Sequence, residues 1–155
     1  MKRTALFTFT LFLLAIMYSS CKEDVYMDWK LMNDRWYATF KDSLKDTNFH
    51  VTTSGLYYKI KHQGYQRHPN PGDYANIKYR GSLVNGSVFD ESTIWLELTT
   101  KGTIKGLNEG IPKMQDGGHY VFYIPSTLAY DTATTLAKIP PHSVLRFDVE
   151  LLKSN

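Results

Sequence analysis

The last part of the chain has the most regular pattern of hydrophobic and polar positions. Its apolar residues alternate strictly with polar ones, at Leu145, Phe147, Val149 and Leu151. Strict alternation is typical of a strand with one face against a core and the other in water. We therefore expect a strand over residues 145–151, held in an antiparallel sheet.

Shorter runs with a similar alternation predict further strands. They cover residues 56–61, 75–83, 94–98 and 119–125. After the second of these, Val84-Asn85-Gly86-Ser87 is a hairpin signal, because Asn and Gly tolerate the positive φ of a type I′ turn. The return strand begins at Val88 and Phe89, and residues 94–98 are expected to form a separate short strand.

Residues 27–45 have a helical pattern instead. Apolar side chains recur at every third or fourth position, at Trp29, Met32, Trp36, Phe40 and Leu44. We predict a helix from Met27 to Lys45. Its apolar face is expected to pack on the body of the domain or on a partner chain, and a homodimer through this helix would explain the N-terminal extension.

A second, shorter helix is predicted over residues 105–114, with Leu107, Ile111 and Met114 on one side. A long loop is expected over residues 126–141. The elements together predict an α+β fold. In it, an antiparallel sheet packs its inner face on the short helix, and an extra helix lies at the N-terminus.

The first twenty residues have the three-part form of a secretory signal. Lys2 and Arg3 precede a mostly apolar run over residues 5–18, shorter than the roughly 20 apolar residues that a membrane-spanning helix needs. Two serines then precede Cys21, the one cysteine of the chain. This arrangement resembles a bacterial lipobox, in which the cysteine is lipidated and becomes the mature N-terminus. An ordinary buried cysteine after a plain signal peptide is the alternative.

These features predict three parts of the chain: a signal peptide (1–20), a lipidated N-terminus with tether and helix (21–50), and a folded domain (51–155). Removal of Lys2 and Arg3 leaves 16 of the 18 basic residues against 15 acidic ones, a net charge of +1. So small a charge, without a basic stripe, argues against nucleic-acid binding. Membrane attachment is therefore expected through acyl chains on Cys21.

The residues that follow the cysteine, Lys22-Glu23-Asp24, resemble the export tags of surface lipoproteins in some Gram-negative groups. We expect a lipoprotein of the cell envelope, attached to the outer membrane on its periplasmic or surface face.

The sequence contains few motifs for covalent or metal chemistry. There is no Gly-x-Ser-x-Gly elbow, and a single cysteine excludes a disulfide framework and a cysteine-rich zinc site. The histidines lack metal-ligand spacing: His50, His62, His68, His119 and His142. We expect no metal site. What remains is a high aromatic content of 14%, which predicts an aromatic-lined core or pocket.

Four segments, in order, resemble the FKBP-type peptidyl-prolyl cis-trans isomerases. They read IKYRGSLVNGSVFDES, TIKGLNEGIPKMQDGG, YIPSTLAYD and IPPHSVLRFDVELL. The resemblance covers about residues 75–153. It implies a half-barrel of antiparallel strands around a short helix, a shallow apolar pocket for a proline side chain, and no cofactor. The partners it implies are proline-containing polypeptides.

Carried over by position, the resemblance places several residues at this pocket. They are Tyr79, Phe89, Asp90, Ile104, Leu107, Tyr130, Ile139 and Phe147. Ile94 is expected to reach in from the strand over residues 94–98, because Leu96 and Leu98 point the same way; Trp95 replaces it if the register slips by one. On pattern alone, Tyr79, Phe89, Ile104 and Phe147 would be core residues.

The resemblance also implies roles for these residues. Phe89, Phe147 and Tyr79 would enclose the proline ring. Asp90 would orient Tyr79 and interact with the rotating carbonyl. The Ile104 main-chain N–H and the Tyr130 hydroxyl would donate hydrogen bonds to substrate carbonyls.

Three features depart from the family pattern. Leu107 replaces the tryptophan of the pocket floor, Asp131 replaces the glycine after the loop tyrosine, and the segment between Phe89 and Ile94 is shorter. The hypothesis of an active isomerase therefore stands beside an alternative, a weak or inactive peptide-binding or chaperone module of an envelope complex.

Overall fold

The computed structural model describes residues 21–40, 45–99, 101–132 and 137–155, with side chains from residue 26 onward. The predicted signal peptide (1–20) and Leu44 lie outside the described residues. Within those residues, no helix is long and apolar enough to cross a membrane.

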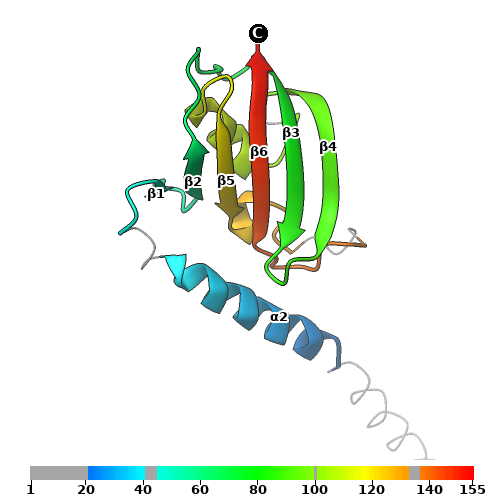
Figure 1. Cartoon of the computed structure of the whole chain (residues 1–155). Helices are drawn as coiled ribbons and strands as arrows, with labels where there is room; N and C mark the ends of the chain where they lie inside the picture. Colours follow the sequence, from blue (N-terminus) through cyan, green and yellow to red (C-terminus); the bar gives the residue numbers. More distant parts are fainter. Residues whose placement is uncertain (1–20, 41–44, 100, 133–136) are drawn as a thin grey trace, which may run out of the picture.

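Six antiparallel strands form one sheet with the order β1-β2-β5-β6-β3-β4 (Figure 1). The strands are β1 (Phe49–Val51), β2 (Tyr57–His62), β3 (Tyr74–Leu83), β4 (Val88–Glu97), β5 (His119–Ile124) and β6 (Leu145–Ser154). Three short helical segments accompany them: α4 (Lys105–Gly110), η1 (Ile111–Lys113) and η2 (Ser126–Leu128). The predicted α+β class and antiparallel sheet around a short helix are confirmed.

The core lies between the inner face of the sheet and α4. The alternation predicted for β6 is present, since Leu145, Val149 and Leu151 are fully buried while Asp148 and Glu150 are only partly so. From the helical side, Leu107, Ile111 and Met114 join the same cluster. The helix approaches closely because Gly110 has no side chain: a Cβ there would lie 2.6 Å from the ring of Phe122.

The predicted helix over residues 105–114 is divided in the structure. The α-helical part ends at Gly110 and a 3₁₀ turn follows over η1. Pro112 has no N–H to donate to a carbonyl four residues earlier, which favours the change at this point.

One strand prediction was wrong, and one strand was missed. Residues 88–97 form one continuous strand, because β4 pairs with β3 from Tyr74↔Glu97 to Ser82↔Val88. Its polar middle, Glu91 to Thr93, is exposed at the edge of the sheet. The strand β1 was not predicted, because three residues are too few to show a pattern. The predicted start of the folded domain, near Val51, falls within this strand.

The N-terminal helix, α2 (Cys21–Ala38), lies across the end of the sheet where β6 begins (Figure 1). Trp29, Trp36 and Phe40 pack on the domain. This is the first of the two predicted alternatives, in which the apolar face of the helix packs on the body of the domain. The prediction for Met32 was wrong, because its side chain is 40% exposed and Asn33 is buried instead. These two residues point about 100° apart around the helix, and the docked face is centred on Asn33.

Candidate active site

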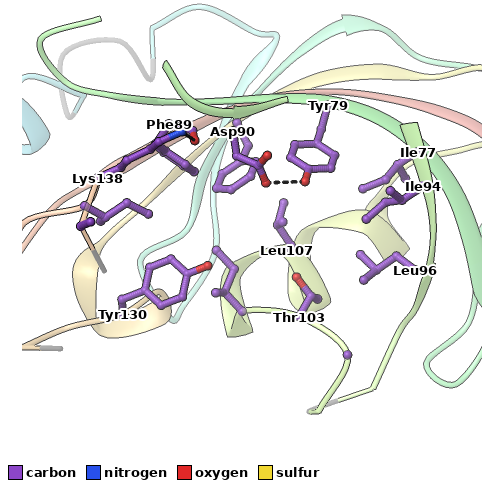
Figure 2. Close-up of a pocket in the computed structure, with 15 residues that line it drawn as sticks. Ile77, Tyr79, Phe89, Asp90, Ile94, Leu96, Thr103, Leu107, Tyr130 and Lys138 are labelled. Carbon is purple, nitrogen blue, oxygen red and sulfur yellow. Dashed lines mark hydrogen bonds between the residues drawn. The ribbon is translucent and has the colours of Figure 1, made fainter. Parts of the chain in front are cut away.

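A pocket of about 480 Å³ opens on the inner side of β3, β4 and β6 (Figure 2). The start of α4 and the loop before β6 close its other sides. It is lined by Ile77, Tyr79, Phe89, Asp90, Ile94, Leu96, Gly102, Thr103, Ile104, Leu107, Tyr130, Ala137, Lys138, Ile139 and Phe147. The lining is mainly apolar, so the pocket suits an uncharged, nonpolar group.

Three aromatic side chains from neighbouring strands form one wall. The ring of Phe147 lies 5.9 Å from that of Tyr79 and 5.6 Å from that of Phe89, the latter edge to face. Gly81 lies opposite Phe147 in the sheet, and a Cβ there would lie 2.6 Å from the Phe89 ring. A glycine at this position is therefore what lets the aromatic rings lie against the backbone.

One polar pair interrupts this wall. The Tyr79 hydroxyl donates a hydrogen bond of 2.6 Å to Asp90 Oδ2. Burial, this hydrogen bond and the negative charge of Asp90 together raise the pKa of Tyr79 to about 12. The hydroxyl therefore keeps its proton at neutral pH and stays a donor to Asp90.

Tyr130 faces this pair from the opposite side, with Leu107 between them (Figure 2). Burial, assisted by the charge of Asp90, raises the pKa of Tyr130. The next residue, Asp131, has a φ of 47°. This is the left-handed region that glycine prefers and that Asp tolerates better than most residues, so Asp131 adopts a conformation suited to the glycine that the resemblance implies at this position.

The floor and the far rim come from α4 and two loops. Leu107 is 5% exposed and lies beneath the aromatic wall. Ile104 is the N-cap residue of α4 and has an extended backbone conformation. Ile139 lies in the loop before β6. Leu107 has a smaller side chain than the tryptophan that the resemblance implies at this position.

The structure brings all nine residues predicted from the sequence to this pocket: Tyr79, Phe89, Asp90, Ile94, Ile104, Leu107, Tyr130, Ile139 and Phe147. The alternative, Trp95, is 52% exposed and does not line it. Among the lining residues that were not predicted, Ile77 and Leu96 share strand faces with Tyr79 and Ile94, so alternation could have found them. Ala137 and Lys138 lie in a loop with no such pattern.

Within the described ranges, no group of three or more His, Cys, Asp or Glu side chains could hold a metal ion. Besides its apolar surface, the pocket presents the hydroxyls of Tyr79, Tyr130 and Thr103, the Asp90 carboxylate, the Lys138 side chain and main-chain groups.

The pKa of Tyr79 leads to a prediction about alkaline stability. Because the folded state raises this pKa from about 10 to about 12, the protonated phenol stabilises the fold below pH 10. That contribution is lost as the pH rises from 10 through 12. We expect urea denaturation to show a steeper loss of stability over this interval for the wild type than for Tyr79→Phe. Parallel curves would contradict the assignment.

Comparison with known proteins identifies relatives of this chain. Residues 65–152 match the family described as FKBP-type peptidyl-prolyl cis-trans isomerase. A probable FKBP-type peptidyl-prolyl cis-trans isomerase FkpA of Neisseria meningitidis serogroup B is 36% identical over 129 residues, 81% of this chain and 47% of that protein. The FKBP-type 22 kDa isomerase of Escherichia coli is 34% identical over 116 residues, 73% of this chain and 56% of its own.

A solved structure agrees with these matches. The crystal structure of FkpA from Escherichia coli superposes with a TM-score of 0.78 at 27% identity, covering 96% of this chain and 71% of the other. The chain spans about half the length of the curated relatives it matches.

Proposed function

Because the chain belongs to the family of FKBP-type peptidyl-prolyl cis-trans isomerases, we propose that it catalyses the cis-trans isomerisation of Xaa-Pro bonds in polypeptides. The observation that supports this most is the pocket itself. An aromatic wall of Tyr79, Phe89 and Phe147 faces the Tyr130 hydroxyl across an apolar floor. Such a cavity suits a proline ring with a polar main chain at its mouth.

The physics of the reaction fits this cavity. An Xaa-Pro bond isomerises through a twisted amide over a barrier of about 18–20 kcal/mol. The twist removes resonance and makes the amide less dipolar, and no covalent bond forms or breaks. An apolar site disfavours the planar, more dipolar ground state relative to the twisted form, which is differential binding of the transition state.

Several of the polar groups have a proposed part in this step. The Tyr130 hydroxyl and the Ile104 main-chain N–H donate hydrogen bonds to substrate carbonyls and hold the chain on either side of the twisting bond. Asp90 fixes the Tyr79 ring through their 2.6 Å hydrogen bond and interacts with the rotating carbonyl. Ile94, Leu107 and Ile139 complete the apolar contact with the proline ring.

The test is the isomerisation rate of a short Xaa-Pro peptide with the purified protein, compared with Tyr130→Phe. Loss of one neutral hydrogen bond, about 1 kcal/mol, is expected to lower kcat/KM about fivefold. The ring remains, so the fold is retained. An unchanged kcat/KM in the variant would exclude the Tyr130 hydroxyl from a role in the reaction.

The second candidate is a peptide-binding or chaperone module with little turnover. It is favoured by Leu107 at the pocket floor, because its side chain would enclose a proline ring less closely than a tryptophan would. A folded protein that binds a proline peptide without accelerating its isomerisation would establish this alternative.

We propose that the protein is a lipoprotein of the cell envelope, acting on exported polypeptides. The support is the signal-like segment 1–20 and the position of Cys21 directly after it. The outer membrane, on its periplasmic or surface face, is the proposed site of attachment. Incorporation of labelled fatty acid into the protein, and its loss in Cys21→Ser, is the expected result; equal labelling would contradict it. Fractionation of the membranes, followed by protease treatment of intact cells, then tests the location.

The exposed side of α2 is proposed to pair two copies of the chain. Met27 and Leu31 are 51% and 44% exposed there, one helical turn apart, and the opposite side is occupied by the protein's own domain. Sedimentation equilibrium is expected to show a dimer that Leu31→Glu dissociates. A wild-type monomer would contradict this proposal.

A further inference from the structure

Helix α2 forms hydrogen bonds to the loop that carries one side of the pocket. The Trp29 indole Nε1–H donates to Ser143 Oγ at 3.0 Å, and Ser143 Oγ donates to the Pro140 carbonyl at 2.6 Å. Pro140 directly follows Ile139, a pocket residue. Two hydrogen bonds therefore connect the helix with the backbone beside the pocket wall.

Asn33 makes the second attachment and is fully buried. Its Oδ1 accepts the Val144 N–H at 2.8 Å, and its Nδ2 donates to the Trp29 carbonyl at 2.8 Å. A buried amide without partners is destabilising, whereas a bonded one fixes the geometry of both groups. An amide on the docked face of a helix is therefore better suited to holding the loop than to filling space.

The same loop reaches Tyr130. The His142 N–H donates to the Asp131 carbonyl at 2.7 Å, and the Asp131 N–H donates to the Ser126 carbonyl at 2.9 Å. In the described part of the chain, His142 and Asp131 are the two non-glycine residues with positive φ, at 62° and 47°. Such conformations persist where surrounding contacts hold them.

We propose that Trp29 and Asn33 are positioning residues for the pocket: by holding Ser143 and Val144 they fix the loop that places Ile139 and, through His142 and Asp131, the Tyr130 hydroxyl. Neither residue lines the pocket. Their effect on turnover rests on the proposed isomerase function.

The test compares Asn33→Ala and Ser143→Ala with a matched variant, Tyr37→Phe. Tyr37 lies on the same helix and donates a hydrogen bond to the domain at the Gly55 carbonyl, away from the loop. We expect kcat/KM to fall about three- to fivefold in the first two variants, close to the effect of losing the Tyr130 hydrogen bond. It should stay unchanged in the third. Equal losses in all three would overturn the inference. If Asn33→Ala does not fold, the comparison of Ser143→Ala with Tyr37→Phe still tests the inference.

A double variant separates positioning from general loosening. If Asn33 acts through the Tyr130 hydroxyl, Asn33→Ala is expected to reduce kcat/KM further by less than twofold once Tyr130→Phe is present, because coupled residues are non-additive. Independent, multiplicative losses would overturn this part of the inference.

A measurement without turnover distinguishes the two proposals. Amide hydrogen exchange at His142 and Asp131 should become faster in Asn33→Ala and Ser143→Ala but not in Tyr37→Phe, because the loop opens when its attachment is lost. This result supports the inference even if the wild type has no isomerase activity, in which case only the proposed function fails. Unchanged exchange at both amides overturns the inference even if the wild type is active.

Discussion

Phe147→Ala is expected to lower kcat/KM for Xaa-Pro isomerisation by about 30-fold or more. Phe147 is 4% exposed and contacts both other rings of the aromatic wall. Loss of about 2 kcal/mol of apolar contact with the proline ring corresponds to that factor. The measurement is the isomerisation rate of a short proline peptide at substrate concentrations below KM.

The same change also affects stability, and a control must separate the two effects. Removing a buried phenylalanine side chain costs about 3–5 kcal/mol, against the roughly 5–15 kcal/mol by which domains are stable. Phe122 pairs with Phe147 across β5 and β6, is fully buried, and does not line the pocket. Phe122→Ala is expected to lose similar stability but to retain activity in its folded fraction. If both variants lose activity equally, Phe147 contributes only to the fold.

Asp90→Ala is expected to lower kcat/KM about tenfold. The carboxylate accepts the Tyr79 hydroxyl at 2.6 Å and lies at the pocket mouth. A hydrogen bond to a charged group contributes about 1.5–3 kcal/mol, and the exposure of Asp90 favours the lower end of that range. At about 1.4 kcal/mol for each factor of ten, the expected loss is about one decade.

The adjacent residue provides the control for charge. Glu91 is also an exposed carboxylate, but it lies 3.8 Å from Arg80 and does not line the pocket. Glu91→Gln is expected to leave kcat/KM unchanged. Asp90→Asn keeps an acceptor for Tyr79 without the charge, so activity between those of the wild type and Asp90→Ala is expected. Full activity in Asp90→Ala would exclude Asp90 from the reaction.

The strands that could be predicted from sequence are those with two unlike faces. In β6, burial alternates with sequence, because the core needs one face and water the other. The same alternation predicted that Ile94, rather than Trp95, reaches the pocket, and Ile94 does line it. Alternation could not reveal that β4 is one continuous strand, because the polar middle of β4 is stabilised by pairing with β3 and needs no buried side chains there.

The docked face of α2 and the loop residues that line the pocket could not be predicted from the sequence, for a different reason. From the sequence alone, Asn33 is expected to be an exposed polar residue. Its burial depends on the hydrogen bond with Val144, which is 111 residues away in the chain. Lys138 lines the pocket because of the path that its loop takes. The local pattern of the sequence does not determine that path. The residue set carried over from the family resemblance was more complete than the pattern alone allowed, since pattern placed Tyr79, Phe89, Ile104 and Phe147 only in a core.

The position of β6 in the sheet has a consequence for incomplete or damaged chains. This strand of 10 residues lies between β5 and β3, and so joins β1-β2-β5 to β3-β4. It also supplies Phe147 to the pocket. A chain interrupted before Leu145, by premature termination or by proteolysis, would lose the connection between the two halves of the sheet together with one wall of the pocket. Truncated products of this kind would be inactive and poorly folded, which leaves them open to degradation without a long-lived, partly functional form.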